Sequence, residues 1–296
     1  MHIAPVDKAQ FTNNQTFLDT YKAHNRPVIF NNVCDDWPAK KKWTVDYLCS
    51  VVGDKMVPLY GGQEAKGRKH QHAHVAQMTF REFITELNNG NSKLRMFFYN
   101  ILAQAPELMK DFYFPKIGLK MFTKLPALFF GGRGAKVQMH FDIDWADLLM
   151  FHFGGKKRVY LFAPDQEKYL YRVPYSYSSL FEIDIDKPDF ERFPALQHAT
   201  GYMAELEHGD TLYIPPGFWH YVVYDDMCFS MTLRALPRNP KHLFNFLYNV
   251  IYIRTADGLM RKFVGQPWND KNRERAFAQG NQFAQQPNAS ASRHLG

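Results

Sequence analysis

The sequence predicts a mainly β fold with flanking helices, in which two sheets form a jelly-roll barrel (a double-stranded β-helix). The first observation is the central stretch, residues 94–236, which consists of short extended runs separated by Gly, Pro and Asp and has the strand density typical of a jelly roll. The second is helical patterning on both sides of that stretch. The third is size, because 296 residues, 46% of them hydrophobic, suffice for one large core.

The predicted strands are runs of β-branched and aromatic residues bounded by turn residues. They are Val28–Phe30, Met56–Tyr60, Arg95–Tyr99, Ala127–Phe130, Val137–Asp142, Arg158–Phe162, Thr211–Ile214, His220–Tyr224 and Cys228–Leu233. We expect four regions. They are an N-terminal region of helices and strands packing on the barrel (1–93), the barrel (94–236), a C-terminal helical region (237–278) and a flexible tail rich in Gln, Asn, Ala and Ser (279–296).

Two N-terminal helices have capping signals. Thr44 is suited to be the N-cap of a helix over Val45–Val52. Thr79 and Glu82 have the spacing of a capping box, which predicts a second helix over Phe80–Leu87.

The C-terminal region contains a helix that is apolar nearly all round, from Leu243 to Ile253. A helix of this kind is either buried in the core or paired with another subunit. We expect it to form the interface of a homodimer, since two-fold dimers are the commonest oligomers.

Charge and cysteine content limit the partners and the compartment. The net charge of +7 comes from scattered basic residues, and without a long basic run a nucleic-acid substrate is less expected than a protein or peptide. The three cysteines form no C-x-x-C pair, so neither a zinc ribbon nor a disulfide scaffold is indicated. No signal-peptide order and no 18-residue apolar stretch are present, which predicts a cytoplasmic protein without a membrane span.

The residues most indicative of chemistry are His140 and Asp142, followed 78 residues later by His220. Residues two apart in a strand point to the same face, so the first two can reach one metal ion. His220 opens another predicted strand after a Pro-Pro-Gly turn and can supply the third ligand. The alternatives are a buried structural role for His220 and an ordinary turn carboxylate for Asp142, with Asp144 and Asp147 as competing carboxylates.

Two histidines and one carboxylate bind one face of an octahedral ferrous ion and leave three positions open. Zinc ordinarily closes to four ligands, and a hydrolytic zinc site keeps one open position. The predicted trio therefore favours an iron(II) site for oxygen chemistry.

Beyond these residues, the chain resembles the cupin-like JmjC hydroxylases, a family that includes the asparaginyl hydroxylase called factor inhibiting HIF. The resemblance covers about two thirds of the chain, from Arg26 to Leu236, and includes the segments RPVIFNNV, WTVDYL, GGKKRVYLFAPDQEKYLY and HGDTLYIPPGFWHYV. It implies a cupin-like barrel that uses iron(II), 2-oxoglutarate and dioxygen. Lys157 matches the family's lysine for the distal carboxylate of 2-oxoglutarate, a task that suits a flexible point charge.

The sequence departs from the family around the expected cosubstrate pocket. A family Thr, Tyr and two Asn are replaced here by Val137, Phe97, Ala146 and Arg234. Arg234 would place a second cation near the cosubstrate. Replacement contacts are expected from Gln138, Tyr99 or Thr232.

The resemblance implies an iron(II)- and 2-oxoglutarate-dependent dioxygenase, with hydroxylation of a protein or peptide side chain as the first expectation. A hydroxylase of modified tRNA or of a small molecule is the second expectation. The rival from another class is a cupin-fold module that binds a metal without turnover, which the departures at Val137 and Phe97 favour.

Overall fold

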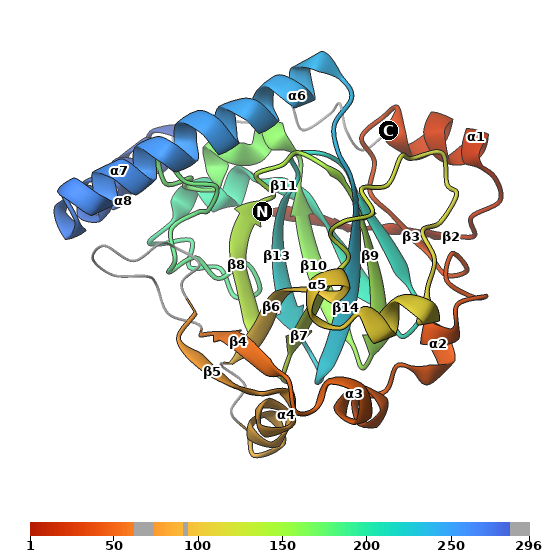
Figure 1. Cartoon of the computed structure of the whole chain (residues 1–296). Coiled ribbons are helices and arrows are strands. Elements are labelled where there is room, and N and C mark those ends of the chain that lie inside the picture. Colours follow the sequence, from red (N-terminus) through yellow and green to blue (C-terminus); the bar gives the residue numbers. More distant parts are fainter. Residues whose placement is uncertain (62–73, 91–93, 285–296) are drawn as a thin grey trace.

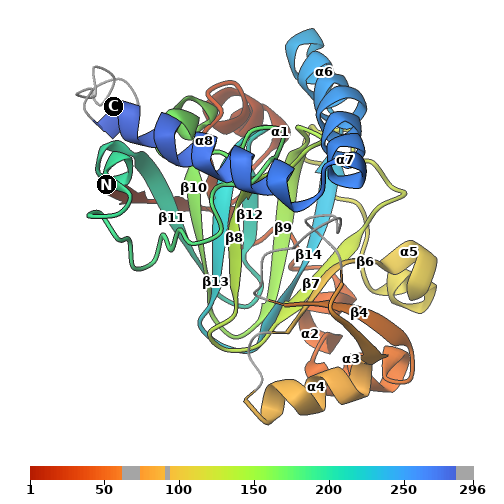
Figure 2. The ribbon, with the colours of Figure 1, turned by 90° about the vertical axis from the view of Figure 1, so that its left-hand side faces the viewer.

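The computed structural model describes residues 1–61, 74–90 and 94–284. Its strands form two sheets that face each other (Figures 1 and 2). The smaller sheet has the order β1-β11-β10-β13-β8, and the larger has the order β2-β3-β12-β9-β14-β7-β6-β4-β5. The predicted jelly roll is confirmed.

Eight consecutive strands build the barrel. They are β7 (Ala127–Gly131), β8 (Lys136–Phe141), β9 (Asp147–Gly154), β10 (Lys157–Phe162), β11 (Thr200–Leu206), β12 (Thr211–Ile214), β13 (Trp219–Tyr224) and β14 (Cys228–Ala235). Strands β8, β10, β11 and β13 belong to the smaller sheet, and the other four belong to the larger one. The chain therefore crosses repeatedly between the sheets, as a jelly roll requires.

The N-terminal region extends both sheets. Its elements are β1 (His2–Pro5), β2 (Asp7–Ala9), α1 (Asn14–Phe17), a π-helical turn (Leu18–Lys22), β3 (Val28–Phe30), α2 (Pro38–Lys42), α3 (Val45–Val52), β4 (Met56–Tyr60), β5 (Ala76–Thr79) and α4 (Phe80–Asn88). Then follow β6 (Arg95–Asn100), α5 (Ile101–Gln104) and a 3-10 helix (Pro106–Asp111). Both predicted caps are confirmed, because the Thr44 hydroxyl accepts from the amide of Tyr47 and the Thr79–Glu82 capping box is complete.

Helices occupy both ends of the barrel, with α3 and α4 at one end and the C-terminal helices at the other (Figure 1). The C-terminal run comprises α6 (Pro240–Leu247), a π-helical segment (Tyr248–Ile253), α7 (Arg254–Phe263) and α8 (Gln266–Ala284). Helix α8 contacts two 3-10 helices, Pro164–Tyr169 and Pro194–His198, and crosses in front of the barrel strands in Figure 2.

The predicted start of the tail at residue 279 is wrong. Residues 279–284 are the last part of α8, and a Cβ on Gly280 would lie 2.2 Å from the ring of Tyr171. Glycine thus allows α8 to lie close to Tyr171, which follows the 3-10 helix Pro164–Tyr169, and this packing outweighs the polar composition. Residues 285–296 lie outside the described residues. The other predicted boundaries, at residues 93 and 236, remain predictions. Strands β1 to β5 are hydrogen-bonded into the same two sheets as the barrel strands, so the sheets continue across residue 93.

The run α6–α7 has an exposed apolar stripe, so of the two alternatives that its apolar character leaves, burial in the core does not apply to these side chains. Phe244, Ile251 and Phe263 are 66%, 64% and 74% exposed. Further exposed apolar side chains on the run are Leu243, Leu247, Tyr248, Tyr252 and Leu259. Spacings of three, four and seven place most of them on one face of the helix.

Two large clusters and one inner cluster form the core. The space between the sheets holds apolar residues such as Val159, Leu161 and Val222. The outer face of the larger sheet packs on the N-terminal helices through Trp37, Trp43 and many aromatic residues. Within the parts of the chain that the structure describes, no helix is both long and apolar enough to cross a bilayer. The three cysteines are all free.

Candidate metal centre

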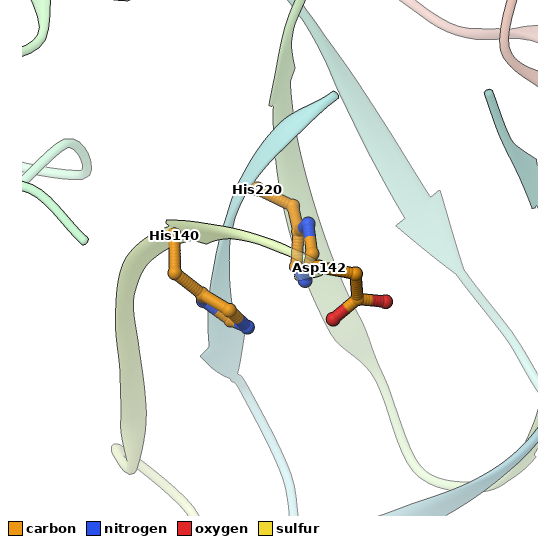
Figure 3. A group of neighbouring side chains, drawn as sticks. All are labelled: His140, Asp142 and His220. Carbon is orange, nitrogen blue, oxygen red and sulfur yellow. The ribbon is translucent and has the colours of Figure 1, made fainter. Parts of the chain in front are cut away.

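His140 and His220 meet because their strands are neighbours in the smaller sheet. Strand β8 pairs with β13 in antiparallel register, with His140 opposite His220, and the two rings lie 4.1 Å apart at 57°. Asp142 follows β8 directly. One ligand atom from each of the three residues lies within 4.8 Å of the others, and Figure 3 shows the three side chains directed toward a common space.

Backbone carbonyls orient both imidazole rings. The Nδ1 of His140 lies 2.7 Å from the carbonyl oxygen of Gln138, and the Nδ1 of His220 lies 3.2 Å from that of Phe218. A protonated Nδ1 donates in each case, so that Nε2 is the ring atom whose lone pair can bind a metal. Burial lowers the pKa of His220, so this ring is in the neutral form that ligation requires.

Asp142 is held in the ionised form by Arg234. The Nη1 of Arg234 donates to Oδ2 of Asp142 at 2.7 Å and lies 3.2 Å from Oδ2 of Asp144. Burial alone would raise the pKa of Asp142, but the charge of Arg234 and its hydrogen bond outweigh burial and lower that pKa. A carboxylate with a low pKa stays available to a cation across the physiological pH range.

The donor set fits a ferrous ion. Two imidazole nitrogens and one carboxylate oxygen converge from a single side, and this combination leaves positions open for other ligands. Among the described residues no other group of three such side chains meets the same criterion. The competing carboxylates lie elsewhere: Asp144 is turned to Arg234, and Asp147 binds Lys22 and the hydroxyl of Tyr213.

Lys157 is a buried cation between the two sheets. It lies opposite Tyr224 in the β10–β13 pair, is 1% exposed, and its Nζ lies 4.4 Å from the centre of the Tyr224 ring. Its ammonium donates to the hydroxyl of Ser230 at 2.7 Å. Among the described residues no carboxylate forms an ion pair with it, and burial lowers its pKa to about 8.

A hydrogen-bonded chain orients Lys157. His152 is fully buried, and burial lowers its pKa to about 3, so its ring is neutral. Its Nε2 lies 2.6 Å from the carbonyl oxygen of Gly155 and its Nδ1 lies 3.2 Å from Oγ of Ser230. Nε2 therefore carries the proton, and Ser230 donates to Nδ1 while it accepts from Lys157.

The remaining predicted pocket residues have different locations. Thr232 and Arg234 follow Ser230 at two-residue spacing on β14, so all three face the space between the sheets. Tyr99 belongs to the core outside the larger sheet, with its hydroxyl 3.5 Å from the carbonyl of Gln104. Gln138 donates its amide to the carbonyl of Ser179 at 2.6 Å. The structure brings Thr232 and Arg234 toward the site but not Tyr99, and Gln138 is engaged elsewhere.

Sequence reasoning missed Ser230 and the contact between Phe98 and Arg234. Ser230 could be found from its two-residue spacing with Thr232 and Arg234. Phe98 has the left-handed φ of +56° and lies under the guanidinium of Arg234, 5.2 Å from its carbon. No residue-type signal marks this conformation, because a bulky residue rarely adopts it.

The departures from the family pattern leave apolar walls near the site. Val137 packs against the inner core cluster, and Ala146 is buried. Phe97 and Phe98 both contact the ring of Phe129, at 5.3 and 5.9 Å. The polar side chains that face this space include Lys157 on β10 and Ser230, Thr232 and Arg234 on β14.

Comparisons with known proteins agree with this geometry. The profile of the family described as the cupin-like domain matches residues 14–252. Lysine-specific demethylase 8 of Xenopus tropicalis is 28% identical over 238 residues, 77% of this chain and 52% of the relative. Human HSPB1-associated protein 1 is 28% identical over 67% of this chain and 45% of its own length. Human tRNA wybutosine-synthesizing protein 5 is 26% identical over 75% of each chain.

The chain spans about half the length of the first two of these relatives. The family profile, in contrast, covers most of this chain, and the matched region contains the barrel together with the three converging ligands. Proteins of this cupin-like JmjC type use iron(II), 2-oxoglutarate and dioxygen, which agrees with the donor set. The chain belongs to the cupin-like domain family, whose JmjC members are typically iron(II)- and 2-oxoglutarate-dependent oxygenases.

Proposed function

We propose that this protein is an iron(II)- and 2-oxoglutarate-dependent dioxygenase that hydroxylates a side chain of a protein or peptide. The observation that carries the proposal is Lys157, a buried ammonium without an acidic partner among the described residues, inside the same barrel as the metal ligands. An unpaired buried charge is costly unless a ligand supplies its counter-ion. A dicarboxylate that chelates the metal through its other end supplies that counter-ion.

Each group of the chain has a role in this proposal. His140, Asp142 and His220 hold the metal, and the carbonyls behind the imidazoles fix their orientation. The chain from His152 through Ser230 holds Lys157. Iron with 2-oxoglutarate supplies oxygen activation, coupled to decarboxylation of the oxo acid to succinate and carbon dioxide. The protein binds, orients and shields the reactants.

Turnover without a known substrate tests the reaction class. The purified protein with ferrous iron, 2-oxoglutarate and air should release succinate slowly, and His220→Ala should release none above background. A parent protein that binds metal but never consumes 2-oxoglutarate, alone or with peptide pools, would instead identify a binding module. A protein or peptide substrate is supported by the names of two relatives. Lysine-specific demethylase 8 is named for an amino acid, and HSPB1-associated protein 1 is named for a protein partner.

A modified tRNA is the second candidate. It is favoured by the match to tRNA wybutosine-synthesizing protein 5, which extends over 75% of both chains, and by the net charge of +7. Nucleic-acid binding of this electrostatic kind weakens steeply with salt. A tRNA-binding assay at two salt concentrations, followed by succinate release with tRNA or peptides added, separates the two substrate classes.

We also propose a homodimer through α6 and α7 and a cytoplasmic location. The support for the dimer is the exposed stripe that includes Phe244, Leu247 and Ile251, since a contiguous apolar face of this length is unusual on a monomer. In a two-fold dimer the same face meets its own copy. The three free cysteines agree with a reducing compartment.

A further inference from the structure

Two irregular segments, residues 112–126 and 236–242, border the end of the barrel that holds the metal ligands. The first lies between a 3-10 helix and β7, and the second leads from β14 into α6. They meet near Arg234, because the amide of Phe122 donates to the carbonyl oxygen of Arg234 at 2.6 Å. The side chain of this arginine reaches Asp142, and 24% of the Asp142 side chain is exposed. The two segments therefore adjoin the metal centre where it opens to solvent.

Both segments carry positive charge and no negative charge. They contain five Lys and Arg residues and no Asp or Glu. All five side chains are exposed, and none forms an ion pair with a described residue. Of the neighbouring carboxylates, Asp142 and Asp144 are bound by Arg234. Asp147 is bound by Lys22. We call the five cations the basic rim; they are Lys116, Lys120, Lys124, Arg238 and Lys241.

The backbone that presents the three lysines of residues 112–126 is fixed by packing. Ile117, next to Lys116, is 2% exposed. Gly118 has a left-handed φ of +84° and lies against Leu18, whose side chain would be 3.0 Å from a Cβ at this position. The hydrogen bond of Phe122 holds the segment further along. The ordering cost of binding a partner therefore falls mainly on the long side chains and not on the backbone.

We propose that the basic rim binds an acidic stretch of the substrate polypeptide, next to the residue that is hydroxylated. This inference rests on the proposed function and deepens it, since it names the charge of the substrate. Carboxylates match the rim because four of its five cations are lysines, whose ammonium is a compact point charge on a flexible stem. Several carboxylates along one peptide can meet several of these charges at once, which favours this partner over a neutral one.

RNA, the alternative polyanion, has less support in these two segments. Recognition of single-stranded nucleic acid combines cations with exposed aromatic side chains on which bases stack, and arginine is the residue best suited to phosphate. Arg238 is the single arginine of the rim. Of the aromatic side chains on the two segments, Tyr113 is half exposed, whereas Phe112 is buried and Phe114 and Phe122 are partly buried. The rim therefore fits carboxylates better than stacked bases.

Fluorescence anisotropy with the full chain tests the rim directly. The probe is a labelled deca-glutamate peptide, and a labelled Gly-Ser peptide of equal length is the uncharged reference. The parent should bind deca-glutamate and not the reference. Binding should weaken as NaCl rises from about 50 to about 200 mM, because salt screens exposed charges.

Two matched variants separate the rim from net charge. Lys120→Gln with Lys124→Gln should weaken deca-glutamate binding about 2- to 30-fold, the range for two exposed ion pairs. Lys187→Gln with Lys271→Gln removes two exposed charges outside the two segments and should bind as the parent does. Substitutions of exposed side chains change stability little, so both variants should fold.

Cross-linking of the unaltered chain gives an independent readout of location. A carbodiimide couples peptide carboxylates directly to lysine amines, and mass spectrometry identifies the lysines that react. Deca-glutamate should couple to Lys120 and Lys124 more than to Lys187 and Lys271, which are also exposed. A purely structural role of the rim lysines would give no such preference.

The outcomes separate this inference from the proposed function. Equal affinity in the parent and in Lys120→Gln with Lys124→Gln overturns the basic rim, as does cross-linking without preference for the rim. A labelled single-stranded RNA that binds more tightly than deca-glutamate and loses affinity in the same variant overturns the acidic peptide as the partner. If the parent still releases succinate in any of these cases, the proposed function stands. Rim-dependent binding by a parent that never consumes 2-oxoglutarate overturns the proposed function, and with it the substrate role of the rim.

Discussion

Replacing Lys157 with methionine should weaken cosubstrate binding and at the same time stabilise the protein without cosubstrate. Methionine has a similar length and no charge, so it fills the same space between the sheets. The ammonium is 1% exposed, has one hydrogen bond, to Ser230, at 2.7 Å, and lies over the Tyr224 ring. It therefore contributes little to the stability of the empty protein.

Both magnitudes follow from these contacts. Burial lowers the pKa of Lys157 from 10.5 to about 8, which corresponds to about 3 kcal/mol of unfavourable free energy for the charged form. Lys157→Met should recover about 1–3 kcal/mol in the free energy of unfolding at pH 7, after loss of the Ser230 and Tyr224 contacts. Loss of the charge-assisted contact to 2-oxoglutarate should weaken its binding by about 10- to 150-fold.

Thermal unfolding with and without 2-oxoglutarate measures both effects. Without ligand the melting temperature of Lys157→Met should rise by about 2–10 °C, and the upward shift caused by 2-oxoglutarate should shrink. Lys156→Met is the matched control, because Lys156 is the exposed neighbour and faces Glu207. A variant that melts lower and binds 2-oxoglutarate like the parent would show that Lys157 is structural, and our reasoning would fail.

Three further predictions concern the metal, pH and assembly. Asp142→Ala should lose most bound iron in a metal-content assay, whereas Asp144→Ala should keep it; equal iron in both would refute the triad. The folded-state pKa of Lys157, about 8, lies below its ordinary 10.5, so the charged side chain destabilises the folded protein fully below pH 8, and this destabilisation is relieved between pH 8 and 10.5. Because Lys157 loses its charge over that range, the affinity for 2-oxoglutarate should fall as the pH rises through 8. An affinity by calorimetry that does not change with pH would contradict this. Light scattering should give twice 34.6 kDa for the parent and about one chain for Phe244→Glu with Ile251→Glu; a parent monomer would rule out the dimer.

Strands could be predicted from the sequence where only one of their two faces is buried, because apolar and polar residues then alternate. Six of the eight barrel strands were predicted from the sequence, but β9 was missed because all of its residues from Asp147 to Phe153 are buried. A strand covered on both faces has no alternation to detect. Strand β11 was missed because Thr200–Leu206 mixes small and polar residues, and its hydrogen bonds to β1 and β10 define it instead.

The candidate site could be predicted in part for a similar reason. His140, Asp142 and His220 carry residue types and a two-residue spacing that indicate a metal, and Lys157 is marked by resemblance. The partner of Arg234 could not be predicted, because its contact with Asp142 spans 92 residues of sequence. The orphaned hydroxyl of Thr232 is likewise a property of the folded surroundings.

Residues 1–9 affect whether another chain can pair with the edges of the barrel sheets. Strand β1 is the outermost strand of the smaller sheet and β2 is the outermost strand of the larger one, and only Val6 separates them. One short segment thus covers an edge of each sheet, with parallel pairing to β11 and β3. Uncovered edges are templates for strand addition by another molecule. Displacing this segment would expose the edges of β11 and β3 together. Its pairing therefore prevents edge-to-edge aggregation at both sheets.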